Sequence, residues 1–327
     1  MKPAGTDGVS RCGSLEGSSV LMQVLVTGGA GFIGSHLVEQ LLSGGADVAV
    51  LDDLSRGSLA NLDSRAALYH GDIRDAGFVR ETLDRVRPEV VLHHAAQVDV
   101  QISVADPALD AAVNTGGAIN LLEACRTAGV RKVVYASSAA VYGDPVYLPV
   151  DEKHPLNPLS GYGISKHTAE HYLAAYRALY GLEFTVLRYA NVYGPRQDAT
   201  GEGGVVAIFT DRLLRGEPPR IFGDGEQTRD FVYAGDVAAA NLAALDKGDG
   251  RVLNVGTGRA VTVNRLLALL QELTGVSLSA EYCPPRPGDI RDSYLDCTAA
   301  QEALGWRADT GLRDGLARTV ACCRKRL

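Results

Sequence analysis

Residues 24–37, with the sequence VLVTGGAGFIGSHL, decide the fold of this chain. An apolar run typical of a strand leads into a turn with glycines three residues apart, and helical spacing follows. Such glycines let the backbone approach a pyrophosphate closely, and the N–H groups at the start of the helix favour its negative charge. The stretch therefore predicts a dinucleotide-binding loop. Its predicted cofactor-binding residues are Gly28, Gly31, Phe32, Ile33 and Gly34.

The next apolar run supports this prediction, because it ends at Asp52, about 20 residues beyond the glycine loop. A carboxylate at that place accepts hydrogen bonds from the ribose of adenosine and repels a 2′-phosphate. The sequence thus favours NAD over NADP. The alternative is an aspartate that only ends a strand in a turn. After the third apolar run, Asp72 is placed to reach the adenine.

Outward from this stretch, apolar runs alternate with helical segments. Continuous apolar strands separated by helices are typical of a parallel sheet buried on both faces. We therefore predict an α/β fold with a doubly wound parallel sheet of the Rossmann type. The predicted strands are 24–27, 48–51, 67–70, 90–93, 133–136 and 184–187, and the predicted helices are 32–42, 77–86, 109–128 and 162–179.

The alternation weakens after about residue 190, where glycine-rich turns separate short elements. We predict an NAD-binding domain over 22–190, with return segments near 230–260 that include a strand at 254–258. A smaller, interleaved α/β substrate lobe is predicted over 191–327. The first 21 residues are rich in Gly and Ser and predict a flexible tail; an ordered arm is the alternative.

Composition excludes several classes of function. The formal charge of −7 and a pI near 5.5 argue against nucleic-acid binding, which usually needs a basic face. No apolar run is long enough to span a membrane. The six cysteines show no metal-ligand spacing, so we expect no metal site and reduced cysteines in a cytoplasmic protein.

A candidate catalytic group begins with Tyr162 and Lys166, four residues apart on a predicted helix and thus on one face. A nearby ammonium lowers the pKa of a phenol from its usual value of about 10, so the tyrosine could exchange a proton near neutral pH. By itself the pair could equally be solvated. Ser138, at the end of a predicted strand, changes this, because its hydroxyl can bind the same substrate oxygen. We predict that all three are catalytic.

These motifs together resemble the extended short-chain dehydrogenase/reductase family over residues 22–327. The later segments that carry the resemblance are LRYANVYGPR at 187–196, FGDG at 222–225, TRDFV at 228–232 and RPGD at 286–289. The resemblance implies that NAD is also held by Asp72, Ile73, Ala95, Ala96, Asn114, Tyr162, Lys166 and Tyr189. It implies that a UDP-sugar is held by Ser138, Tyr162, Asn191, Val206, Phe222, Arg229, Arg286, Asp289 and Ser293.

The resemblance also narrows the reaction. Dehydratases and decarboxylases of this family carry acidic residues just after the catalytic hydroxyl, where this chain has Ala139 and Ala140. The alanines point to reversible 4-epimerisation of a UDP-hexose through a transient 4-keto sugar. UDP-glucose and UDP-galactose are the expected pair. Ser293 is small and predicts room for the N-acetyl group of UDP-GlcNAc and UDP-GalNAc.

Two alternatives stay open. One is a 4-epimerase of UDP-glucuronate or another nucleotide sugar for polysaccharide assembly, and the other is a non-catalytic NAD-binding regulator. Val98 stands where related epimerases commonly have a lysine that contacts the cofactor, so NAD retention is expected to be looser. The resemblance finally implies a homodimer, formed by the helices predicted at 109–128 and 162–179.

Overall fold

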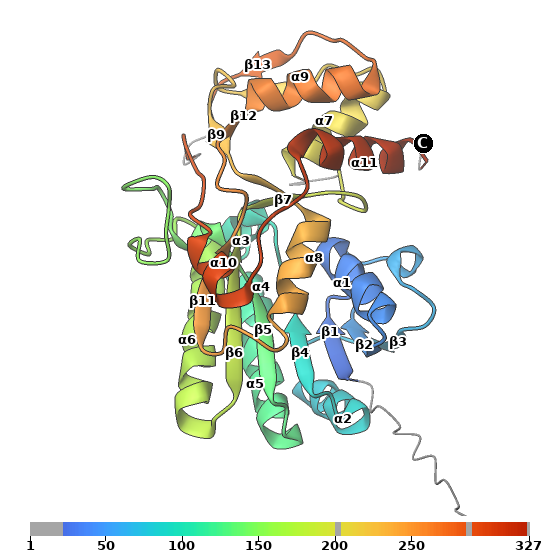
Figure 1. Ribbon diagram of the computed structural model, residues 1–327, viewed down its shortest axis with the longest axis vertical. Coiled ribbons are helices and arrows are strands. Elements are labelled where there is room, and N and C mark those ends of the chain that lie inside the picture. The colour runs from blue at the N-terminus through green and yellow to red at the C-terminus, as the bar shows by residue number, and fades with distance from the viewer. Residues whose placement is uncertain (1–21, 200–203, 286–289, 326–327) are drawn as a thin grey trace, which may run out of the picture.

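The computed structural model describes residues 22–199, 204–285 and 290–325. The predicted tail at 1–21 and the predicted substrate residues Arg286 and Asp289 lie outside this part. In Figure 1, a large sheet with helices on both faces lies below a smaller lobe of helices and short strands. Within the described ranges, no helix is long and apolar enough to cross a membrane.

The central sheet has seven parallel strands in the order β11-β6-β5-β4-β1-β2-β3, which confirms the predicted doubly wound fold. The strands are β1 (Gln23–Thr27), β2 (Asp47–Asp52), β3 (Ala67–His70), β4 (Val90–His93), β5 (Lys132–Ser138), β6 (Glu183–Tyr189) and β11 (Arg251–Val255). β11 pairs in parallel with β6, from Arg251 opposite Thr185 to Val255 opposite Tyr189. The predicted return strand therefore exists, but it begins at Arg251 rather than at Asn254.

Two hydrophobic cores cover the two faces of the sheet. On one face pack α2 (Ala76–Val86), α5 (Gly117–Ala128) and α6 (Gly161–Tyr180), and on the other pack α1 (Phe32–Ser43), α8 (Ala234–Ala243) and α10 (Thr298–Leu304). Every residue of β4 is buried, as expected for a strand covered on both sides. Central strands such as β4 can therefore present polar groups to a ligand only at their ends.

The helix predicted at 109–128 is three consecutive pieces in the structure. A short α4 (Pro107–Ala111) is followed by the π-helical turn η2 (Ala112–Gly116) and then by α5. The start lies at Pro107, because Asp106 caps the helix by accepting a hydrogen bond from the backbone N–H of Leu109. A π-helical turn widens the helix locally and is frequent at functional sites. Here it contains Asn114, a predicted cofactor residue.

The smaller lobe has its own core, formed by α7 (Val205–Leu214), α9 (Val263–Thr274) and α11 (Leu312–Arg324). Three short sheets pair β7 (Asn191–Tyr193) with β10 (Phe231–Tyr233), β8 (Arg220–Phe222) with β13 (Glu281–Cys283), and β9 (Thr228–Arg229) with β12 (Val261–Thr262). Short elements α3 (Val100–Ala105), η1 (Leu59–Asn61) and η3 (Ala139–Val141) complete the described chain.

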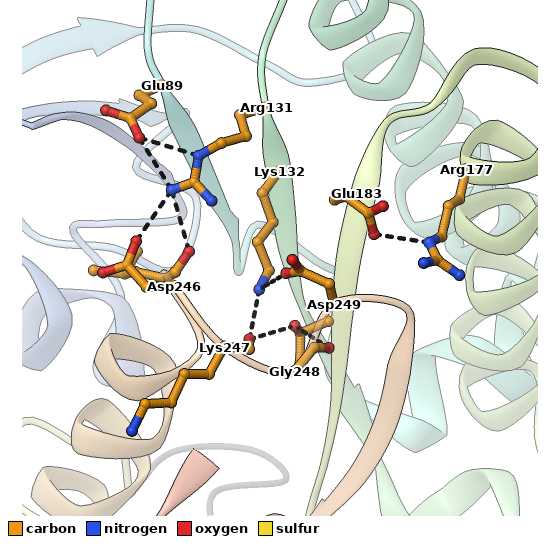
Figure 2. A network of polar contacts seen from close by, with 11 residues as sticks. Glu89, Arg131, Lys132, Arg177, Glu183, Asp246, Lys247, Gly248 and Asp249 are labelled. Atoms are coloured by element: carbon orange, nitrogen blue, oxygen red, sulfur yellow. Dashed lines mark hydrogen bonds and ion pairs between the residues drawn. The ribbon is translucent and has the colours of Figure 1, made fainter. Parts of the chain in front are cut away.

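A polar network lies at the amino ends of β5, β6 and β11 (Figure 2). The side chain of Lys132 is fully buried, and its Nζ donates hydrogen bonds of 2.5 Å to the carbonyl of Lys247 and to Oδ1 of Asp249. Burial lowers the pKa of Lys132, and the bond to Asp249 opposes this. The ammonium thus ties the turn before β11 to the first residue of β5.

Replacing Asp249 by Ala is expected to lower the free energy of unfolding by about 1–3 kcal/mol, because it removes the only carboxylate bound to this buried ammonium among the described residues. Asp246→Ala is the control, since Asp246 is 69% exposed and a surface ion pair contributes about 0–1 kcal/mol. Urea unfolding followed by circular dichroism measures both. Equal stability of the two variants would contradict the assignment.

Candidate active site

The glycine loop leaves no room for side chains. Gly28 has a φ of +71°, and a Cβ placed on it would lie 2.6 Å from the backbone nitrogen of Ala95. A Cβ on Gly34 would lie 2.1 Å from the carbonyl oxygen of Gly28. The loop is therefore pressed between the first turn of α1 and the segment that follows β4. This gives the close backbone approach that a pyrophosphate-binding loop requires.

The start of α1 suits an anion. Gly31 is its N-cap, and no side chain within the described residues caps the helix, so the N–H groups of the first turn, which contains Phe32 and Ile33, face a possible ligand. Beside the loop, Asp52 accepts 2.8–2.9 Å hydrogen bonds from the backbone N–H groups of Ala30 and Leu54, one at each oxygen. Each oxygen keeps a second lone pair for a ribose hydroxyl. These features fit a dinucleotide such as NAD.

The other predicted cofactor residues lie around the carboxyl ends of the strands. Asp72 follows β3 and forms a 2.5 Å ion pair with Arg74, which lowers the pKa of its carboxyl. Ile73 is buried and packs against Gly117 of α5, where an added Cβ would lie 2.5 Å from Cδ1 of Ile73. Tyr189 ends β6; its hydroxyl lies 3.0 Å from Nε2 of His94 and is hydrogen-bonded to Asn241.

The structure brings Ser138, Tyr162 and Lys166 together. Ser160 caps α6, and Tyr162 lies in the first turn of this helix. Lys166 is buried, its Nζ donates a 2.9 Å hydrogen bond to the carbonyl of Ala136, and it lies 5.9 Å from the centre of the Tyr162 ring. The Ser138 hydroxyl is close enough to the phenol of Tyr162 to favour its ionised form. A hydroxyl, a phenol and an ammonium thus converge where β5 ends.

The pKa of Tyr162 differs from the prediction. Burial raises it, and the nearby hydroxyl of Ser138 opposes the rise without cancelling it. Burial also lowers the pKa of Lys166 to about 8, so the ammonium is a weaker partner than one in water. The expectation that Lys166 would by itself bring the pKa of the phenol below its usual value is therefore wrong, because burial disfavours the phenolate.

Several buried polar residues of the site were not predicted. Glu170, one turn beyond Lys166, forms a buried ion pair with Arg188 (2.6 Å) and accepts a 2.6 Å hydrogen bond from Ser137, the neighbour of Ser138. Gln97 and Asp110 surround the predicted residue Asn114. Each is an ordinary polar residue of a loop or helix in the sequence. A polar residue on the apolar face of a helix is the available signal, and Glu170 is such a residue.

Apart from Ser138 and Tyr162, the predicted substrate residues that the structure describes lie in the smaller lobe. Asn191 is exposed in β7, Phe222 and Arg229 are half-buried in β8 and β9, and the backbone N–H of Ser293 donates to the carbonyl of Thr228 (3.2 Å). Ser293 is thereby placed next to Arg229. Val206 is a correction, because its side chain is only 1% exposed and packs in the core of the lobe. Only its main chain could contact a ligand.

Comparisons with known proteins agree with this geometry. Residues 24–256 match the NAD dependent epimerase/dehydratase family. The UDP-glucose 4-epimerase of Mycolicibacterium smegmatis is 47% identical over 306 residues, which cover 91% of this chain and 97% of that protein. Two solved structures are also similar. The UDP-glucose 4-epimerase of Thermotoga maritima, with UDP-glucose, has a TM-score of 0.91 and 50% identity, and covers 93% of this chain and 99% of its own.

The second structure is the UDP-glucose 4-epimerase of Thermus thermophilus, in complex with NAD. It has a TM-score of 0.89 and 45% identity, and the match covers 94% of this chain and 100% of that one. Identity at this level over almost the whole chain, together with a seven-stranded parallel sheet, a glycine loop and the Ser138–Tyr162–Lys166 group, leads to one conclusion. The chain belongs to the NAD dependent epimerase/dehydratase family.

Proposed function

We propose that this protein catalyses the reversible, NAD-dependent 4-epimerisation of a UDP-hexose, with UDP-glucose and UDP-galactose as the main pair. The main support is that Ser138, Tyr162 and Lys166 converge beside the glycine loop. In addition, the two residues that follow Ser138 are the alanines Ala139 and Ala140. A proton exchanger next to a dinucleotide site supports oxidation and reduction of a sugar alcohol. The alanines provide no carboxylate for eliminating water or for decarboxylation.

In the proposed mechanism, NAD accepts a hydride from C4 of the sugar and later returns one to the opposite face. Tyr162, as phenolate, takes the proton of the 4-hydroxyl and gives it back to the 4-keto sugar, so no net oxidation occurs. Ser138 holds the same oxygen by a hydrogen bond. Lys166 is held by the carbonyl of Ala136 and provides the positive charge that favours the phenolate.

We assign NAD to the larger, sheet-containing domain and the UDP group to the smaller lobe. Arginine suits a diphosphate, because its planar donors match the phosphate oxygens. Arg229, with Arg286 from outside the described residues, is therefore proposed to hold the diphosphate. Asn191, Phe222 and Asp289 are proposed to contact the nucleoside and the sugar. Strong binding of UDP with loose binding of the hexose allows the keto sugar to turn over between the two hydride transfers.

Purified protein with NAD is expected to convert UDP-glucose to UDP-galactose without accumulation of NADH, and Tyr162→Phe is expected to lower kcat by about 100-fold or more, because it removes the proton exchanger. Tyr180→Phe, an exposed tyrosine on the same helix, is the control and keeps the activity. Chromatography of the sugar nucleotides measures both. UDP-glucuronate is tested in parallel, and exclusive turnover of that sugar would replace UDP-hexose as the substrate.

Ser293 is proposed to make UDP-GlcNAc and UDP-GalNAc a second substrate pair. Its backbone is held beside β9, and its side chain is small, half-buried and next to Arg229. Ser293→Tyr is expected to lower kcat/KM for UDP-GlcNAc by about 10-fold or more, because it fills the space for the acetamido group, and to change the value for UDP-glucose much less. Parallel kinetics with both sugars measure this. No turnover of UDP-GlcNAc by the unmodified protein would refute the assignment.

We further propose that the protein is a homodimer in the cytoplasm. Exposed apolar side chains gather on α6, where Ile164 is 54%, Tyr172 38% and Leu179 70% exposed, and Val104 of the adjoining α3 is 65% exposed. Such a patch on a helix surface is typical of a subunit interface. The thiols of Cys125, Cys283, Cys297 and Cys322 are free, which supports a reducing compartment.

Replacing Tyr172 and Leu179 together by Glu is expected to convert the dimer to a monomer of 34.5 kDa, because it places two charges in the apolar interface. Light scattering after size exclusion measures the mass. Glu81→Ala, a change on the distant helix α2, is the control and leaves the mass unchanged. A monomeric mass of the unmodified protein would contradict the dimer.

A further inference from the structure

Asp110 is a buried carboxylate that the proposed mechanism does not use. It lies in α4, directly before the π-helical turn, and is only 1% exposed. Its Oδ1 accepts hydrogen bonds from Nε2 of Gln97 (2.9 Å) and Nδ2 of Asn114 (3.1 Å). Within the described residues, its hydrogen-bond donors are thus neutral amides. A buried charge that has only neutral partners needs a compensating charge nearby.

The hydrogen bonds around Asp110 connect it to α6, the catalytic helix, which contains Tyr162 and Lys166. Asn114 and Gln97 bind each other through two further hydrogen bonds of 2.8 and 2.9 Å, and Asn114 also donates to Oγ of Ser165 (3.1 Å). Ser165 in turn donates to the carbonyl of Tyr162 (3.1 Å). Asp110 therefore orients the amides that connect the segment after β4 to the turn of α6 that contains Tyr162.

Asp110 also acts through its charge on Tyr162 and Lys166, called the Tyr162–Lys166 pair below. After burial, which lowers the pKa of Lys166 to about 8, Asp110 is the strongest influence in the opposite direction, followed by Glu170. Burial raises the pKa of Tyr162, and the charge of Asp110 adds to this. The negative charge thus favours protonation of both groups.

The other groups that face the pair contribute less charge. Glu170 is in contact with Arg188, at 2.6 Å, which neutralises it. Burial and the charge of Lys166 lower the pKa of His93 and of His94 to about 3, so both are neutral. Burial raises the pKa of Tyr135 and of Tyr189, so these phenols are neutral too. Asp110 is thus the negative charge near Tyr162 and Lys166 that has no contacting cation among the described residues.

We propose that Asp110 is a positioning residue and counter-charge for the Tyr162–Lys166 pair: it orients Asn114 and Gln97 beneath the pair and keeps Lys166 protonated while Tyr162 exchanges its proton. The inference rests on the proposed epimerase function for its kinetic test, but the geometry and the charges do not depend on the identity of the sugar.

The test is Asp110→Asn in the full-length protein. This change removes the charge and nearly preserves the shape. Because Asp110 raises the pKa of both groups, its loss lowers both. Both limbs of the kcat–pH profile are expected to move to lower pH, by roughly 0.5 to 1 unit, because Tyr162 ionises and Lys166 loses its proton at lower pH once the charge of Asp110 is gone. Asp106→Asn is the control, because it removes an equal charge from the exposed cap of the same helix.

A second readout does not need turnover. Tyrosinate absorbance is titrated for the unmodified protein and for Asp110→Asn, each with Tyr162→Phe as its reference, and the ionisation assigned to Tyr162 is expected to move to lower pH. This shift would remain measurable if no UDP-hexose were turned over, so failure of the proposed function is distinguishable. If Asp110→Asn does not fold, Asp110→Ser, which keeps an acceptor oxygen, replaces it. Unmoved pH limbs with an unmoved titration, or a uniform loss of kcat at all pH values, would overturn the proposal.

Discussion

The close contact between the backbones of Gly28 and Ala95 is the constraint on which the site depends. β1 and β4 are neighbours in the centre of the sheet, and the Thr27 hydroxyl accepts hydrogen bonds from the backbone N–H groups of His94 and Ala95, at 3.2 Å each. With no Cβ at Gly28, the dinucleotide loop lies directly on the segment after β4. That segment contains Gln97, which binds Asn114. The loop, the π-helical turn and the catalytic helix are thus connected by short-range contacts.

The two edges of the sheet use buried polar groups for different purposes. At the amino edge, Lys132 binds Asp249 and the carbonyl of Lys247, and its role is to connect strands (Figure 2). At the carboxyl edge, the one hydrogen bond of Lys166 among the described residues goes to the carbonyl of Ala136, and its ammonium faces two aromatic rings, so its charge is left available to the site. The difference follows from the partner, because a contacting carboxylate would neutralise the charge that a phenolate needs.

Most of the fold could be predicted from local sequence patterns, that is, from apolar runs and helical spacing. The strands at 67–70 and 90–93 have the predicted bounds, and the helix at 161–180 differs from its prediction by one residue at each end. These elements are strongly apolar or strongly periodic, and their end signals are local. The segment 107–128 differs, because its π-helical turn is maintained by side-chain contacts of Asn114 with residues 17 and 51 positions away. A short stretch of sequence does not indicate contacts with residues so far away along the chain.

The sequence by itself determined the chemistry available to the protein: a glycine loop between strand and helix, Asp52 after the second strand, and a serine, a tyrosine and a lysine at family-typical spacing. These features depend on spacing within one or two elements, so they can be read along the chain. The tertiary structure alone decided how strongly each group is perturbed. Burial raises the pKa of Tyr162, removes the side chain of Val206 from any ligand and places Asp110 near Lys166. Desolvation and charge act through space between segments distant in sequence, and only the folded arrangement specifies those distances.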